Sequence, residues 1–124
     1  MQTQEIPREQ WNRFFDSFSQ QHQGWLATLE LFSPELGAQE EAHELPFEGI
    51  SLSAESAQTE SIVISLAQTT REHVSHKIDQ PRHVWLLQTP KGADASLEIE
   101  ADDSAKTLLS FRSPVRPEFI DDVM

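Results

Sequence analysis

Three histidines lie within eleven residues of one another and form the cluster best suited to metal chemistry: His73, His76 and His83. Imidazole nitrogens bind zinc, copper, nickel and iron, so this spacing invites a transition-metal interpretation. The surrounding pattern predicts a β-strand, however, and residues three apart on a strand point to opposite faces unless a bulge intervenes. We therefore expect no metal site, and these three histidines are the only candidates for one.

A second cluster is acidic and consists of Glu40, Glu41, Glu44 and Glu48. Carboxylate oxygens are ligands that calcium and magnesium prefer, but the segment lacks the spacing and the central glycine of an EF-hand loop. We favour a solvated acidic face. Charges of this kind keep a sheet edge from pairing with other chains.

The motifs of the common catalytic centres are absent from the sequence. There is no Gly-x-Ser-x-Gly turn for a nucleophilic serine, and the four glycines are scattered rather than gathered in a phosphate-binding loop. Cysteine is absent, which excludes disulfides, thiolate zinc sites, iron–sulfur clusters and thiol catalysis. We expect no cofactor and favour a non-enzymatic binding module. The alternative is a small-molecule or metal-dependent enzyme with its site in the mouth of a curved sheet, built from the three histidines.

The net charge of the chain is −12, from 21 acidic residues and 9 lysines and arginines. This sign opposes binding to nucleic-acid phosphates and to anionic membranes, and it favours a basic protein partner. No apolar run approaches the roughly 20 residues that span a bilayer, and the N-terminal segment lacks the pattern of a signal peptide. We expect a cytoplasmic protein. A salt-adapted protein whose surface charge is itself the adaptation is a further alternative.

One amphipathic helix is predicted over residues 7–22. Pro7 suits a first helical position, and the aromatic residues that follow share one helical face. These are Trp11, Phe14, Phe15 and Phe18. Gly24 then accepts the left-handed conformation that ends many helices.

Apolar residues alternate with polar ones over much of residues 25–112, which predicts β-strands separated by short polar turns. Pro46 interrupts one of these segments, where we expect an edge strand or a bulge. We predict one α+β domain over residues 1–124. Its N-terminal helix packs on a curved, mostly antiparallel sheet of six or seven strands, either a meander or a partly open barrel. The aromatic stripe of the helix would then plug one face or mouth of the sheet.

Residues 113–124 form a proline-containing tail that leaves the sheet. Phe119 and Ile120 have no obvious place to pack, so they dock either on the body of the protein or on a second copy. Arg112 and Arg116 are candidate partners for acidic groups. These four residues are the predicted interface of a homodimer.

Several short phrases together resemble a small bacterial protein family of unknown function. They are Ile6-Pro7 with Trp11, Gly24-Trp25, Glu44-Leu45-Pro46 with Glu48-Gly49-Ile50, and Phe111-Arg112-Ser113-Pro114 with Pro117-Glu118. The likeness spans nearly the whole chain. It implies a small, soluble bacterial protein and transfers no activity, ligand or catalytic residue.

Overall fold

The computed structural model describes residues 2–54, 60–67, 72–88 and 95–112. Within these ranges a single α-helix, α1, covers Trp11–His22 and follows a 3-10 turn, η1, at Arg8–Gln10. There are eight strands: β1 (Gln2–Glu5), β2 (Leu26–Ser33), β3 (Gly37–Ala54), β4 (Glu60–Ala67), β5 (His73–Asp79), β6 (Pro81–Gln88), β7 (Ala95–Ala101) and β8 (Lys106–Arg112). They form one sheet in the order β1-β6-β7-β8-β2-β3-β4-β5, and every neighbouring pair is antiparallel.

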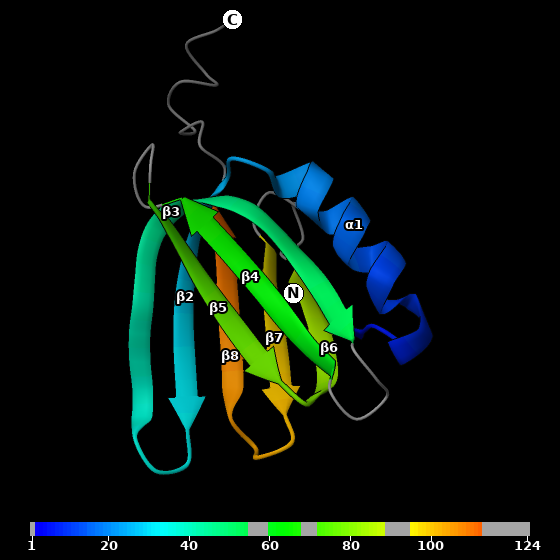
Figure 1. The fold of residues 1–124 in the computed structure, drawn as a ribbon, viewed down its shortest axis with the longest axis vertical. Coiled ribbons are helices and arrows are strands. Elements are labelled where there is room, and N and C mark those ends of the chain that lie inside the picture. The colour runs from blue at the N-terminus through cyan, green and yellow to red at the C-terminus, as the bar shows by residue number, and fades with distance from the viewer. Residues whose placement is uncertain (1, 55–59, 68–71, 89–94, 113–124) are drawn as a thin grey trace, which may run out of the picture.

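The sheet folds over on itself into two layers because the 18-residue strand β3 passes from one layer to the other (Figure 1). The first half of β3 pairs with β2 in the back layer, and residues 47–54 pair with β4 in the front layer. Between the halves Glu44 has a φ of 49°, and the register with β4 shifts between Phe47 and Gly49. The bulge expected near Pro46 is therefore present, and β3 is the outermost strand of both layers.

A second corner connects the layers at the other end of β5. Gln80, with a φ of 52°, turns the chain directly from β5 in the front layer into β6 in the back layer. The carbonyl of Gln80 accepts a hydrogen bond of 2.9 Å from the amide of Asp102, which ties this corner to the turn between β7 and β8. Strands β5 and β6 are consecutive but do not pair, so the sheet is not a simple meander.

The mostly antiparallel sheet and the N-terminal helix are confirmed, whereas the predicted strand number and helix length are wrong. The sheet has eight strands because the polar segment Gln2–Glu5 pairs with β6 as β1. The sheet is not closed, since β1 and β5 are its two ends. Its residues show no apolar alternation that would identify a strand. The helix is shorter than residues 7–22. Pro7 has an extended ψ of 145° and begins the 3-10 turn, closed by a 2.9 Å bond from the Gln10 amide to the Pro7 carbonyl.

Helix α1 covers one side of the two layers and contacts both. The ring of Phe18 lies 6.3 Å from that of Phe47 on β3 and 5.1 Å from that of Phe111 on β8. Trp11 is buried and donates its indole N–H to the carbonyl of Ile6 at 2.9 Å. The predicted aromatic stripe thus fills the space between the layers. Within the described residues, no helix is long and apolar enough to cross a membrane.

The rest of the core lies between the two layers and is aliphatic. Residues with no exposed surface include Ile62, Ile64 and Leu66 on β4, Leu97 and Ile99 on β7, and Leu109 on β8. They alternate with half-exposed neighbours along each strand, as the period of two requires, except that Ser61 beside Ile62 is also buried. This core holds the front layer over the back layer and leaves one side of the front layer open.

Candidate functional site

The open side of the molecule is bordered by the free edge of β5, the last strand of the sheet. In an antiparallel pair, successive residues direct their backbone N–H and C=O groups alternately to one neighbour and to the other. The amide of Gln80 donates to the carbonyl of Glu60 on β4 at 3.0 Å, so the even-numbered residues of β5 bond to β4. Ser75 and Lys77 therefore direct their backbone groups away from β4, toward a side that carries no described strand.

A cleft of about 310 Å³ lies beside this edge. Its walls come from β5, from the hairpin between β2 and β3, and from the turn between β7 and β8. Leu31, Ile78 and Thr107 are among the residues that line it. The volume is at the lower end of the range typical of small-molecule sites.

Two large apolar side chains are exposed in the cleft. Phe32 is 37% exposed and Leu36 is 68% exposed, and they are the exposed large hydrophobic residues of the described part of the chain. Both line the cleft. Single exposed apolar residues are common on protein surfaces, but a group of them at a concave site is typical of a binding surface.

His76 is the one predicted metal candidate that lies in the cleft. Burial lowers the pKa of its imidazole below the ordinary value, and the negative charge of Glu41 opposes this shift without cancelling it. The ring is therefore neutral at pH 7. Within the described residues, no hydrogen bond connects it to a serine, a threonine or a carboxylate.

The structure separates His73 and His83 from His76 and from each other. His73 points to the opposite face of β5, and its Nδ1 lies 2.7 Å from Glu48 Oε1. His83 is on β6, with its Nδ1 2.8 Å from Glu5 Oε2 and its ring stacked on Trp85 at 5.2 Å. Within the described residues, no group of three or more histidines and carboxylates is placed to hold a metal ion.

The acidic cluster of β3 faces basic groups, one for each glutamate. Besides the contact of Glu48 with His73, Glu40 Oε1 lies 2.7 Å from His43 Nδ1, and Glu44 Oε1 lies 2.9 Å from a guanidinium nitrogen of Arg112. Glu41 is the carboxylate that acts on His76. The four carboxylates are thus spread along the strand rather than converging on one point. Of the predicted interface residues, only Arg112 lies within the described part of the chain, and Arg116, Phe119 and Ile120 lie outside it.

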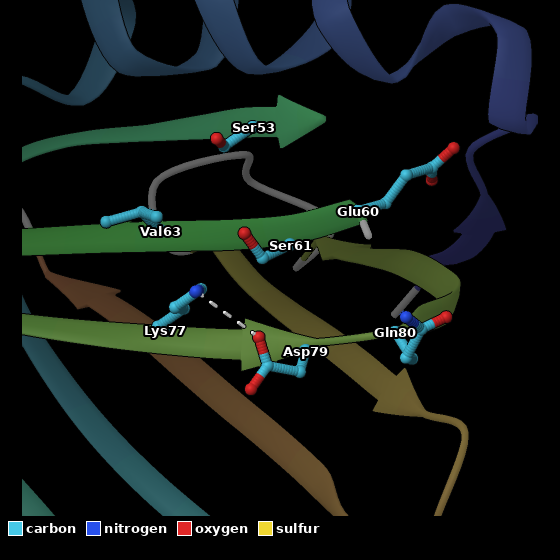
Figure 2. Close-up of a pocket in the computed structure, with 7 residues that line it drawn as sticks. All are labelled: Ser53, Glu60, Ser61, Val63, Lys77, Asp79 and Gln80. Carbon is cyan, nitrogen blue, oxygen red and sulfur yellow. Dashed lines mark ion pairs between the residues drawn. The ribbon is translucent and has the colours of Figure 1, made fainter. Parts of the chain in front are cut away.

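A second hollow, of about 550 Å³, lies on the outer face of the front layer. Figure 2 shows Ser53, Ser61 and Val63 on neighbouring strands and Lys77 beside Asp79, with an ion pair of 3.7 Å between the last two. Its lining is mainly hydroxyl and charged groups, and Lys77 and Asp79 also line the cleft. Residue Lys77 therefore stands on the rim between a polar surface and an apolar cleft.

The sequence interpretation missed the apolar residues of the cleft. Leu36 lies in residues 33–37, whose proline and glycine are typical of a turn, and Phe32 directly precedes them at the end of an apolar run. The sequence signal was the large apolar side chain of Leu36 inside a turn segment. The adjacent apolar residues Leu31 and Phe32, which break the alternation, lie just before it. Their exposure depends on which parts of the fold pack around them, which local periodicity does not state.

The comparisons with known proteins identify a family but no function. Neither a curated protein nor a solved structure matches the chain. A protein family described as a family of unknown function, DUF5335, matches residues 2–118. This match agrees with the resemblance to a family of unknown function drawn from the sequence. It covers nearly the whole chain, and the chain therefore belongs to the DUF5335 family.

Proposed function

We propose that this protein is a non-enzymatic binding module whose site is the cleft beside β5. The observation that carries the proposal is the position of Phe32 and Leu36. Each is an exposed large apolar residue, and both line one concave site. Exposed apolar surface costs free energy in water, and a partner that covers it recovers that cost.

The charge of the chain favours a basic partner. A net charge of −12 attracts cationic molecules over long range and speeds their encounter with the site. The apolar cleft would then supply affinity and the surrounding charge would supply the association rate.

Selection from a random-peptide phage library on the wild-type chain tests this function. We expect enriched peptides whose binding is lost in Leu36→Lys, which places a charge in the cleft. Gln20→Lys is the matched control, because Gln20 is exposed on α1 and the change adds the same charge. Failure to enrich any peptide, or peptides that bind Leu36→Lys as well as Gln20→Lys, would contradict the proposal.

One observation favours an enzyme as the second candidate function. His76 lies in the cleft with a neutral imidazole, which suits a general base near neutral pH. A screen of p-nitrophenyl esters and phosphates on the wild-type chain and on His76→Gln separates the two functions. Turnover by the wild type that disappears in His76→Gln would favour the enzyme.

A further inference from the structure

We infer that the cleft takes an extended basic peptide segment, which adds to β5 as a further antiparallel strand. Apolar side chains at alternate positions of the segment would enter the cleft, and basic side chains between them would face solvent. This inference rests on the proposed binding function and names the class of partner.

The backbone of β5 carries the first part of the argument. Ser75 and Lys77 present N–H and C=O groups to the open side, at the edge of a seven-residue strand. Such an edge is a template for strand addition, in which main-chain hydrogen bonds give affinity and pockets for alternate side chains give specificity.

The floor of the cleft carries the second part. Leu31 of β2 and Thr107 of β8 are paired in the back layer, and they line the cleft together with Ile78 of β5. Stacked sheets lie about 10 Å apart, a gap that side chains fill. A strand added beside β5 would place every second side chain over this floor, as the strands of the front layer already do.

The shape of the open side favours one strand over a second copy of the chain. Figure 1 shows the back layer extending past β5, so that the ends of β2 and β8 lie beyond the front layer. Two copies joined through β5 would each bring such a projecting back layer to the same place. A single extended segment meets no such obstacle.

Charge specifies the polar positions of the segment. The ammonium group of Lys77 on the rim already has a carboxylate partner, because its Nζ lies 3.7 Å from Asp79 Oδ1. The negative charge of Glu41 acts on His76, and Asp103 and Lys106 also line the cleft. With the whole chain at −12, basic side chains on the segment are favoured over acidic ones.

The probe for this inference is a capped heptapeptide, matched in length to β5, with valine and lysine at alternating positions. Its affinity for the full chain is measured by calorimetry. We expect this alternating peptide to bind. A peptide of the same composition whose valines are adjacent should bind at least about tenfold more weakly. A version with glutamate in place of lysine should not bind. Equal affinity of the alternating and rearranged peptides would overturn the inference.

The backbone contribution is tested on both partners. Lys77→Pro removes an outward N–H that β4 does not use, whereas Lys77→Ala removes only the side chain. We expect Lys77→Pro to bind about tenfold more weakly than Lys77→Ala. Two further peptides carry N-methyl groups at the odd positions or at the even positions, and both are tested on the wild-type chain, whose folding is not in question. Only one of the two should lose binding, because only alternate N–H groups of an added strand face β5. Loss of binding by both N-methylated peptides, or by neither, would overturn strand addition.

These outcomes separate the inference from the proposed function. Suppose that library peptides require Leu36 while N-methylation at odd and at even positions has the same effect on binding. In that case the cleft binds through side chains alone, and only strand addition fails. Light scattering tests whether a second copy of the chain occupies the edge of β5 instead. A dimer that the heptapeptide dissociates would identify a second copy as the molecule on β5 and would overturn the peptide inference.

Discussion

The two sides of the front layer differ in how their strand edges are covered. On one side the edge of β3 faces α1, and the hydroxyl of Ser19 accepts from the amide of Ile50 at 2.9 Å and donates to its carbonyl at 3.1 Å. On the other side the edge of β5 faces the cleft. The chain thus supplies its own partner for one edge and leaves the other open.

The apolar surface follows the same division. Phe15 and Phe18 are buried on the helix-covered side, with 1% and 3% of their surface exposed. Phe32 and Leu36 are exposed on the open side. The helix-covered side therefore serves stability, and this difference supports our proposal that the open side serves binding.

Shortening one aromatic residue on each side should give unequal effects. We expect Phe18→Ala to lower the free energy of unfolding by about 3–5 kcal/mol, because it leaves a cavity against Phe47 and Phe111. Phe32→Ala should cost less than about 1 kcal/mol, because its side chain already meets water. Urea unfolding measures both. Similar losses for the two variants would contradict the division.

The contact that closes the edge of β3 should have a measurable effect of its own. Ser19→Ala removes both hydrogen bonds to the part-buried backbone of Ile50 and should cost about 1–2 kcal/mol. Ser17→Ala is the control on the same helix, because Ser17 is exposed and its hydroxyl only accepts a 3.4 Å bond from Gln21. A Ser19→Ala variant as stable as Ser17→Ala would show that this edge needs no cover.

The helix-covered side should also make stability sensitive to acid. His22 stacks on Phe18 with 4.1 Å between ring centroids and donates its Nδ1–H to the Phe18 carbonyl at 3.0 Å. Burial lowers its pKa, and the bond to that carbonyl opposes the shift without cancelling it. The folded state therefore binds this proton less readily than the unfolded state. The stability that neutral His22 provides is complete above about pH 6.5 and falls as the pH drops below that value.

Replacing His22 isolates this effect. In His22→Gln, the decline of unfolding free energy on acidification should be shallower than in the wild type by at most about 1.4 kcal/mol per pH unit. His43→Gln, which makes the same substitution at an exposed histidine, is the control. Urea unfolding at a series of pH values gives the slopes. Parallel slopes for His22→Gln and the wild type would contradict the assignment.

The smallest expected effect on stability concerns the C-terminal tail. We propose that Phe119 and Ile120, with Arg116, dock on a second copy of the chain, and that Arg112 contributes from the end of β8. A chain ended after Pro114 should then sediment as a monomer where the full chain is a dimer, with the free energy of monomer unfolding unchanged. A full-length monomer that truncation leaves unaltered would dispose of the homodimer.

Much of the fold followed from local periodicity. The spacing of Trp11, Phe15 and Phe18 predicted the buried face of α1, and alternation predicted the strands from β2 to β8. Two features did not follow. The segment Gln2–Glu5 is polar, so its pairing with β6 depends on a partner about 80 residues away. The passage of β3 between layers depends on a bend that only the packing of both layers determines.

The candidate site was predictable only in part. His76 was singled out, but for metal binding, and the structure places it in the cleft apart from the other two candidates. Phe32 and Leu36 were not singled out, because alternation does not show which apolar residues the fold leaves uncovered. The exposure of an apolar residue is set by what covers it, and here the cover comes from strands distant in sequence.

Amide hydrogen exchange of the full chain tests the difference between the two edges most directly. In the free protein we expect the Ile50 amide, bonded to Ser19, to be protected and the Lys77 amide to exchange rapidly. Adding the alternating valine–lysine heptapeptide should slow Lys77 and Ser75 and leave Ile50 and His76 unchanged. Protection of Lys77 in the free chain, or peptide binding that leaves its exchange unaltered, would contradict an open edge that receives a strand.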